Sequence, residues 1–297
     1  MKGHDRIVSS LPHPALSESR ITGAARLAGV IGWPVTHSRS PALHNHWLAR
    51  YGLDGAYVPL PVAPGRLAEA LSGLRACGFR GVNITLPHKE AAFALCDSLD
   101  DSARGAGAAN TLVFTEDGRI HGLCTDGTGF LDNLRAHGVD PLAGPALILG
   151  AGGSARAIAA GLLGLGVPVT IANRTPERAE ALCAALPGLA RLDWADWAAA
   201  LGRFALLVNT TSAGMGGTPA LTPDLAAAAD SLTVADIVYV PRLTPFLAAA
   251  EARGLRCVGG LGMLLHQARG GFSAWFGIDP VVDDALAALV GADIPER

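Results

Sequence analysis

The sequence predicts an α/β protein with two domains, each built around an open sheet. Short apolar runs alternate with helical patterns along the chain, which is typical of parallel sheets with helices on both faces. The 297 residues are more than a single hydrophobic core usually organises. Half of the residues are hydrophobic and only 16% are charged, so the chain can bury two such cores.

Turn and capping residues divide the first half of the chain into elements. Pro41 suits the first position of a helix, and Ser40 before it suits the N-cap. Glu116-Asp117-Gly118 is a turn signal between two apolar runs, so these two strands should form a hairpin. The expected strands are 27–31, 56–59, 81–85, 111–114 and 119–124, and the expected helices are 41–51, 64–77, 89–97, 100–105 and 130–137.

The second half continues the same alternation of strands and helices. The alanine-rich pieces 198–200 and 226–229 are also expected to be helical. The expected strands are 146–149, 167–172, 206–209, 234–238 and 256–258. The first expected helix begins with residues 156–160, and the later ones are 176–185, 245–252, 263–276 and 280–290.

The break between the two domains is expected near Asp126, and the chain should cross back near Gly259-Gly260. The second domain is then inserted between two parts of the first. The N-terminal segment lacks an apolar run and does not resemble a secretory signal. The expected spans are 1–125 together with 261–297 for the first domain, 126–260 for the second domain, and 1–26 for a flexible extension.

A glycine-rich turn opens the sheet of the second domain. Residues 150–155, Gly-Ala-Gly-Gly-Ser-Ala, follow the apolar strand 146–149 and precede a small, apolar helix. This order suits a dinucleotide pyrophosphate. The first glycine permits a tight turn, the second lets backbone N–H groups approach the phosphates, and Ala155 lets the helix pack closely.

The end of the next strand distinguishes between two dinucleotides. An NAD site places Asp or Glu there to bind the ribose 2′-hydroxyl. In this chain the strand ends in Asn173-Arg174-Thr175 and Arg178 follows, so two guanidinium groups can meet a 2′-phosphate. The sequence therefore predicts NADP as the cofactor.

Composition argues against several other classes of protein. A net charge of −3 and a pI near 6.3 provide no basic surface for nucleic acid or an anionic membrane. The uncharged stretch 157–173 is interrupted by glycines and a proline, so it is not a membrane span. The five cysteines are widely spaced, which favours reduced, mostly buried thiols in a cytoplasmic protein. His44 and His46 face different sides of a helix, so we expect no metal site.

Polar residues follow several expected strands, at the edge where open α/β sheets bind ligands. Lys89 closes the segment 83–89 and could transfer a proton, although a surface lysine is the alternative. Asp126 lies among glycines after a strand and could instead be a helix cap or turn residue. Ser38 and Ser40 precede a helix whose N-terminus suits a carboxylate, while Ser40 also suits simple capping.

Three further segments point to the same edge. Residues 209–215 follow a strand and should line the cofactor crevice. Tyr239 comes after the next strand and should lie near the same crevice. Gln267 stands one turn after Met263, on the same face of the last long helix.

These motifs, in this order, resemble the shikimate dehydrogenase family. That family uses NADP to interconvert shikimate and 3-dehydroshikimate in the biosynthesis of chorismate and the aromatic amino acids. The resemblance implies a Rossmann-like NADP-binding domain and an open-sheet α/β substrate domain. It covers nearly everything after residue 27 and rests on the segments 30–34, 37–41, 83–89, 105–110, 125–130, 150–155, 173–175, 209–215, 236–239 and 260–267.

The resemblance also implies a role for each matched residue. Lys89 and Asp126 would form the catalytic pair, and Asp101 would lie at the cofactor side of the cleft. Val240 departs from the family, which commonly has Asn there, and this affects fine specificity. The residues implied for substrate are Ser38, Ser40, Thr85, Asn110, Tyr239 and Gln267. The residues implied for NADP are Gly150, Ala151, Gly152, Gly153, Ser154, Asn173, Arg174, Thr175, Arg178, Ile237, Gly260 and Met263.

Two other functions fit the same sequence. A quinate dehydrogenase, or an enzyme acting on both quinate and shikimate, would share almost every motif. A catalytically silent NADP-sensing module would keep the glycine turn, but the intact pair of Lys89 and Asp126 argues against it. For the assembly, the sequence leaves a monomer and a homodimer open.

Overall fold

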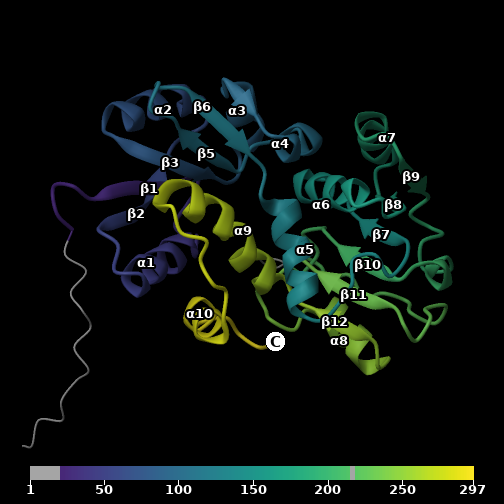
Figure 1. Cartoon of the computed structure of the whole chain (residues 1–297). Coiled ribbons are helices and arrows are strands. Elements are labelled where there is room, and N and C mark those ends of the chain that lie inside the picture. Colours follow the sequence, from purple (N-terminus) through teal and green to yellow (C-terminus); the bar gives the residue numbers. More distant parts are fainter. Residues whose placement is uncertain (1–20, 215–217) are drawn as a thin grey trace, which may run out of the picture.

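The computed structural model describes residues 21–214 and 218–297. Most of the expected extension 1–26 and Met215 of the segment 209–215 therefore lie outside the described residues. The described chain forms two six-stranded sheets, each accompanied by helices (Figure 1). The predicted α/β class is confirmed.

The first sheet has the strand order β2-β1-β3-β5-β6-β4. Strand β1 pairs in parallel with β2 and β3, whereas β5 runs antiparallel to both β3 and β6. The expected hairpin is confirmed, and its tight turn makes this sheet mixed instead of parallel throughout. The strands are β1 (Arg26–Gly32), β2 (Gly55–Pro61), β3 (Phe79–Ile84), β4 (Ser98–Leu99), β5 (Thr111–Phe114) and β6 (Ile120–Leu123).

The second sheet is parallel, with the order β12-β11-β10-β7-β8-β9. The chain starts in the middle with β7, moves outward to β9, and returns to β10 on the other side of β7. This is the Rossmann-like order, in which ligands bind beyond the carboxyl ends of the two central strands. The strands are β7 (Ala146–Leu149), β8 (Val169–Ala172), β9 (Leu189–Leu192), β10 (Leu206–Asn209), β11 (Thr233–Asp236) and β12 (Arg256–Val258).

Ten α-helices of the described residues cover the sheets, and two of them, α5 and α9, pack against each other between the sheets (Figure 1). Met263 of α9 belongs to the core of the second sheet, whereas Leu265 and Phe272 of the same helix belong to the core of the first. Helix α9 therefore fixes one sheet relative to the other. The helices are α1 (Ser40–Arg50), α2 (Leu67–Ala76), α3 (Lys89–Ala94), α4 (Asp101–Ala106), α5 (Asp126–Ala136), α6 (Gly153–Gly164), α7 (Pro176–Ala185), α8 (Pro245–Ala252), α9 (Gly260–Phe276) and α10 (Asp284–Val290).

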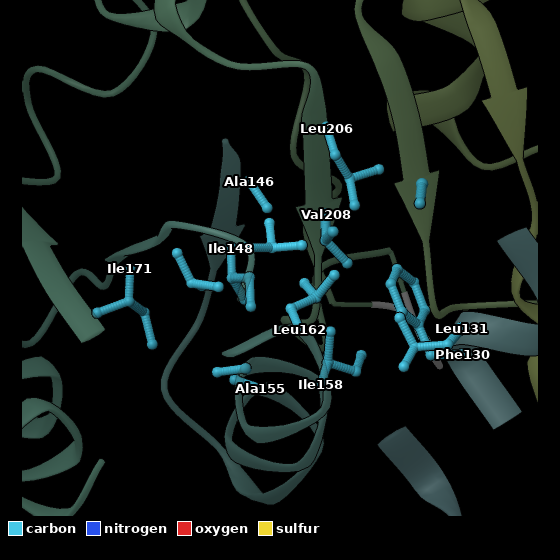
Figure 2. Close-up of a cluster of buried hydrophobic side chains, with 14 of the residues drawn as sticks. Phe130, Leu131, Ala146, Ile148, Ala155, Ile158, Leu162, Ile171, Leu206 and Val208 are labelled. Carbon is cyan, nitrogen blue, oxygen red and sulfur yellow. The ribbon is translucent and has the colours of Figure 1, made fainter. Parts of the chain in front are cut away.

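Apolar packing under the second sheet holds the glycine turn in place. Ile148 of β7 and Val208 of β10 lie over Ile158 and Leu162 of α6, and all four are fully buried (Figure 2). Each such side chain contributes about 1.5–3 kcal/mol through burial. The start of α6 is therefore anchored at the end of β7.

Helix α1 begins one residue earlier than the sequence predicts. Arg39 is its N-cap, with helical backbone angles, and Ser40 is already inside the helix. The Ser40 side chain makes no capping hydrogen bond, so the expected N-cap role is wrong. The Ser40 side chain instead forms a hydrogen bond with the Tyr57 hydroxyl.

The two alanine-rich pieces are not α-helices, which corrects the prediction. Residues 198–200 lie in a series of turns that ends in the short 3-10 helix Leu201–Arg203, and residues 226–229 form turns and irregular chain. Short alanine runs cannot repay the cost of helix nucleation. Trp197 and Leu201 instead anchor the segment in the core of the second sheet.

Other differences concern the ends of elements and very short strands. Strands β4 and β9 were not predicted, and they are short pieces at or near sheet edges. Helices α5 and α9 begin earlier than expected, at Asp126 and Gly260, and α10 begins later, at Asp284. The early start of α5 places Asp126 at a helix N-terminus.

The five cysteines are free thiols, but the expectation that most are buried is wrong. Cys124 is buried, Cys77 is exposed, and the others are partly exposed. Within residues 21–214 and 218–297, no helix is long and apolar enough to cross a membrane.

Candidate active site

A cavity of about 560 Å³ lies where the carboxyl ends of strands from both sheets meet. The loop after β1, the end of β3 and the start of α3 line one side, and the loop after β11 and the start of α9 line the other. The structure brings together both predicted catalytic residues and every predicted substrate residue in this cavity: Lys89, Asp126, Ser38, Ser40, Thr85, Asn110, Tyr239 and Gln267.

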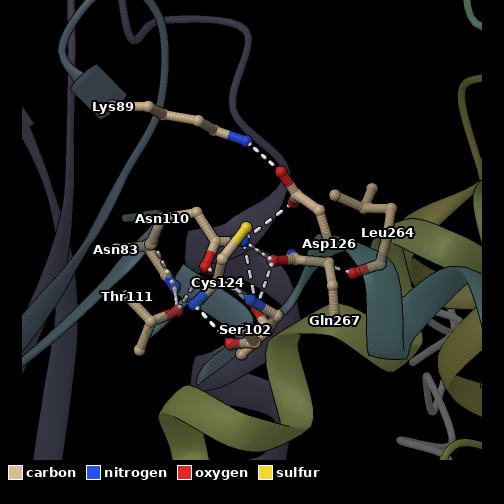
Figure 3. Close-up of polar contacts among 10 residues, drawn as sticks. Asn83, Lys89, Ser102, Asn110, Thr111, Cys124, Asp126, Leu264 and Gln267 are labelled. Atoms are coloured by element: carbon tan, nitrogen blue, oxygen red, sulfur yellow. Dashed lines mark hydrogen bonds and ion pairs between the residues drawn. The ribbon is translucent and has the colours of Figure 1, made fainter. Parts of the chain in front are cut away.

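Lys89 and Asp126 form an ion pair at the cavity wall. Each is the first residue of its helix, α3 and α5, and the Lys89 Nζ lies 2.5 Å from the Asp126 Oδ2 (Figure 3). Burial lowers the pKa of Lys89, but the charge and hydrogen bond of Asp126 outweigh this effect and raise the pKa above its ordinary value. Lys89 is therefore charged at neutral pH.

The carboxylate of Asp126 is held from a second side by Asn110. The Asn110 Nδ2 donates to the Asp126 Oδ1 at 2.8 Å, and the Asn110 Oδ1 accepts from the Thr125 backbone N–H at 2.9 Å (Figure 3). These two contacts fix the orientation of the Asn110 amide. With one oxygen on Lys89 and one on Asn110, the Asp126 carboxylate cannot turn freely.

Gln267 enters the same cluster because α5 and α9 approach closely. A Cβ on Gly129 of α5 would lie only 2.5 Å from the Gln267 Cβ, so a glycine is required there. The Gln267 Nε2 donates to the Leu264 carbonyl at 3.1 Å, and its Oε1 lies 3.4 Å from the Asn110 Nδ2. The tertiary contact of two helices thus supplies this cavity residue.

Hydroxyl groups line the end of the cavity near α1. Ser40 is buried and Ser38 is partly exposed, and the Ser40 N–H donates to the Ser38 Oγ at 3.4 Å. The neighbouring Arg39 also lines the cavity, but its guanidinium is engaged, because it pairs with Asp293 and donates to the Val290 carbonyl at 2.7 Å. This end of the cavity therefore offers neutral hydroxyl donors to a ligand.

Tyr239 provides a hydroxyl on the opposite side of the cavity. It follows β11, in the loop that precedes α8, as predicted from the sequence. Burial raises the pKa of its phenol, so the hydroxyl stays protonated and can donate a hydrogen bond.

The glycine turn has the shape that a pyrophosphate requires. Gly150 has φ +107°, and a Cβ there would lie 2.7 Å from the Thr210 Oγ1. Nothing lies within 4 Å of a Cβ on Gly152 or Gly153, so the backbone at the start of α6 faces open space. Ala155 is fully buried against the sheet. The residues present therefore fit a dinucleotide at the N-terminus of a twelve-residue helix.

Four of the predicted cofactor residues also line the 560 Å³ cavity, namely Ser154, Ile237, Gly260 and Met263. The other residues of the turn and those after β8 do not line it. They lie instead along the carboxyl edge of β7 and β8, which are neighbours in the second sheet. The two groups together span a path from the turn into the cavity.

The segment after β8 is open to a phosphate. Arg174, Thr175 and Arg178 are exposed, and the Asn173 Nδ2 donates to the Thr175 carbonyl at 2.8 Å. Neither guanidinium has an acidic partner in the part of the chain that the structure describes. Two unpaired positive charges beside the glycine turn suit a 2′-phosphate.

Two further residues named in the sequence analysis also lie outside the cavity. Asp101 is exposed at the first position of α4. Asn209 is buried and ties β10 to β11, because its Nδ2 donates to the Asp236 Oδ1 at 3.0 Å. Its contribution is to hold two strand ends together next to the cavity.

Sequence reasoning assigned no role to several residues that the cavity contains. Asn83, His37 and Arg39 lie inside the motifs that point to the site, yet only the structure shows them at its wall. Asn83 had a visible signal, since it is an amide between Val82 and Ile84 in the buried half of strand β3. A buried strand tolerates such a residue only with partners for its polar atoms.

A glycine turn that fits a phosphate, two exposed arginines beside it and a lysine–carboxylate pair in the neighbouring cavity together define a nicotinamide-dependent oxidoreductase. Residues 30–112 match the sequence model of the shikimate dehydrogenase substrate binding domain, and residues 140–238 match that of shikimate / quinate 5-dehydrogenase. The chain belongs to the shikimate dehydrogenase family.

Curated relatives and solved structures support this assignment. The shikimate dehydrogenase (NADP(+)) of Acidiphilium cryptum is 62% identical over 274 residues, which cover 92% of this chain and 99% of the relative. The enzyme of the same name from Gluconobacter oxydans is 58% identical over 279 residues, covering 92% and 99%. The crystal structure of shikimate 5-dehydrogenase from Thermus thermophilus in complex with NADP(H) and shikimate has a TM-score of 0.80 at 38% identity, covering 90% and 99%.

Proposed function

We propose that the protein catalyses the reversible, NADP-dependent reduction of 3-dehydroshikimate to shikimate, a step of chorismate and aromatic amino acid biosynthesis. The observation that carries this proposal is the Lys89–Asp126 pair inside a cavity lined by hydroxyl and amide side chains. The relatives named above as NADP-dependent shikimate dehydrogenases, and the Thermus thermophilus complex, support it.

The polar lining suits a small hydroxylated carboxylic acid. Ser38 and Ser40 donate hydroxyl hydrogen bonds to the substrate carboxylate, a charge-assisted contact. Thr85, Asn110 and Gln267 face the ring hydroxyls, and Tyr239 closes the site from the side of the second sheet. This distribution leaves Lys89 and Asp126 beside the reacting end of the molecule.

The turn and its neighbours would hold NADP. Gly150, Ala151, Gly152, Gly153 and Ser154 present backbone N–H groups to the pyrophosphate. The segment 173–175 and Arg178 would bind the adenosine ribose and its 2′-phosphate, whereas Ile237, Gly260 and Met263, which line the cavity, would hold the nicotinamide end. When bound, this cofactor supplies the hydride that reduces the C3 ketone.

Lys89 moves the proton of the reaction. Negative charge develops on the ketone oxygen during reduction, and the protonated Nζ stabilises that charge and donates a proton to it. Asp126 favours the charged lysine and aims it, which suits reduction. In the oxidation direction Lys89 must first lose its proton, and the same carboxylate opposes this loss.

The decisive experiment measures the absorbance of the reduced cofactor, NADPH or NADH, with four substrate pairs: shikimate or quinate, each with NADP or NAD. Rapid turnover of shikimate with NADP, and slower turnover of the other three pairs, supports the proposal. Comparable kcat/KM for quinate and shikimate assigns dual specificity instead. NADP binding without turnover of either acid assigns an NADP-sensing module.

Dual specificity for quinate and shikimate is the second candidate function, and three observations favour it. One matched family model covers both shikimate and quinate dehydrogenases. The quinate dehydrogenase of Corynebacterium glutamicum in complex with NAD superposes with a TM-score of 0.83 at 28% identity, covering 90% of this chain and 99% of that one. Val240 stands beside the cleft where the family commonly has Asn.

We also propose that the protein acts in the cytoplasm as a monomer or homodimer, with small molecules as its only partners. The five free cysteines suit a reducing compartment. Light scattering of the purified protein distinguishes monomer from dimer.

A further inference from the structure

A buried tyrosine lies at the far end of a hydrogen-bond chain that leads to Asp126. The Tyr57 hydroxyl of β2 donates to the Asn83 Oδ1 at 2.6 Å. Tyr57 is 1% exposed and does not line the cavity, so it cannot touch a substrate there. Its connections to the cavity run through its hydrogen-bond partners, Asn83 and Ser40.

The chain continues in one direction as far as Asp126. The Asn83 Nδ2 donates to the Thr111 Oγ1 at 3.0 Å, and the Thr111 hydroxyl donates to the Asn110 Oδ1 at 3.0 Å (Figure 3). The Asn110 Nδ2 then donates to the Asp126 Oδ1 at 2.8 Å. Every link has its donor on the side of Tyr57 and its acceptor on the side of Asp126.

The two ends fix this direction. Burial raises the pKa of Tyr57 well above its ordinary value, so the phenol keeps its proton and donates. The ionised Asp126 carboxylate can only accept. If the Asn83 amide turned over, its oxygen would face the Asn110 carbonyl, which accepts from the Asn83 Nδ2 at 3.2 Å. Two facing acceptors repel each other, so the reversed arrangement is disfavoured.

The surroundings hold the Tyr57 ring and backbone firmly. The His44 ring stacks on it with centroids 4.0 Å apart and an interplanar angle of 5°. The Tyr57 backbone N–H donates to the Asn45 Oδ1 at 3.0 Å, and the Asn45 Nδ2 donates to the Tyr57 carbonyl at 2.8 Å. Helix α1 thus sets the position from which the hydroxyl donates.

From this geometry we propose that Tyr57 is a positioning residue for the catalytic pair. Its hydroxyl sets the amide orientation of Asn83, and through Thr111 and Asn110 it holds the Asp126 carboxylate in the position that aims Lys89. The proposal rests on the proposed function for the identity of the reaction, but not for the geometry of the chain.

Tyr57→Phe tests the proposal, because it removes one hydroxyl and keeps the stacked ring. The buried Asn83 oxygen loses its donor, and the amide turns or shifts to find another. We expect kcat to fall about fivefold to tenfold while the KM for NADPH stays within about twofold, since the chain does not reach the glycine turn. Tyr51→Phe is the matched control. It removes the acceptor of the Val281 N–H at 3.0 Å, away from the chain, and should retain the wild-type kcat.

A second variant, Thr111→Val, breaks the same chain at another link. If the two residues act through one chain, the double variant loses no more kcat than the worse single variant, which is a non-additive result. Losses that multiply, or a Tyr57→Phe variant with wild-type kcat, overturn the proposal. A fall in Tm with unchanged kcat shows a purely structural role and also overturns it.

A measurement without substrate separates this proposal from the proposed function. The side-chain amide ¹H–¹⁵N signals of Asn110 report its hydrogen bond to Asp126 in the free protein. Tyr57→Phe should shift these signals and Tyr51→Phe should not. Unchanged signals overturn the chain even if shikimate is turned over. Shifted signals support it even if the wild type acts on neither acid.

Discussion

Asp126→Asn is the most informative change in the catalytic pair, because it replaces a charged oxygen by an amide of the same shape. Asp126 receives two contacts, from the Lys89 Nζ at 2.5 Å and from the Asn110 Nδ2 at 2.8 Å. The asparagine side chain is neutral and has only one oxygen that accepts hydrogen bonds. Its NH2 group would therefore face one of the two donors. The substitution therefore weakens one contact and makes the other repulsive.

The expected loss follows from these two contacts. Hydrogen bonds to a charged group are worth about 1.5–3 kcal/mol each, so losing the aim and charge of this pair raises the barrier by about 3 kcal/mol. A rise of this size lowers kcat by about 10²-fold, the usual scale of acid–base catalysis. Lys89→Ala should lower kcat by at least as much.

The pH dependence gives an independent check on the same variant. The wild-type Lys89 has a raised pKa because the Asp126 charge outweighs burial, so it stays protonated at neutral pH. Without that charge, burial dominates and the pKa of Lys89 falls. Reduction needs the protonated lysine, so activity should decline at a lower pH in Asp126→Asn than in the wild type.

The assay is the initial rate of 3-dehydroshikimate reduction over a range of pH, with NADPH affinity measured separately by fluorescence. Affinity should change little, since neither residue belongs to the glycine turn. A variant that loses NADPH binding but keeps most of its turnover would refute the reasoning and make the pair structural. An unchanged basic limb would refute the assignment of Lys89 as the proton donor.

Three further results follow from the site and the fold. Arg174→Ala should weaken NADP far more than NAD and reduce a preference that we expect to be at least about tenfold, about 1.4 kcal/mol, in kcat/KM; equal losses for both cofactors would contradict the phosphate assignment. Turnover of quinate should be at least about tenfold slower than turnover of shikimate, because the additional hydroxyl of quinate crowds the end of the cavity that Ser38 and Ser40 line. Burial raises the pKa of Asp236 from its ordinary 3.8 to about 6, so the folded chain binds this proton more tightly than the unfolded chain. The free energy of unfolding should therefore fall as pH rises from about 4 to about 6, and Asp236→Asn should flatten this dependence, as measured by urea unfolding at several pH values.

Local sequence signals determined much of this protein. The glycine turn, the arginines after the next strand and the alternation of elements act over a few residues, so their consequences can be read without knowing the fold. Helix α7, strand β10 and strand β12 have the predicted bounds for the same reason. The polar residues at strand ends could be predicted as a group, since parallel strands bring their carboxyl ends to one edge.

Only the tertiary structure decided which of these residues meet and what else supports them. Ser40 looked like a helix cap, and its release from that role depends on where α1 begins against its neighbours. The contact between Gln267 and Asn110 exists because Gly129 allows α5 and α9 to approach, a fact that spans distant parts of the chain. Tyr57 carried no sequence signal, because a tyrosine in a strand is ordinary. Its place at the end of a hydrogen-bond chain arises from the pairing and packing of separate strands, which no local pattern records.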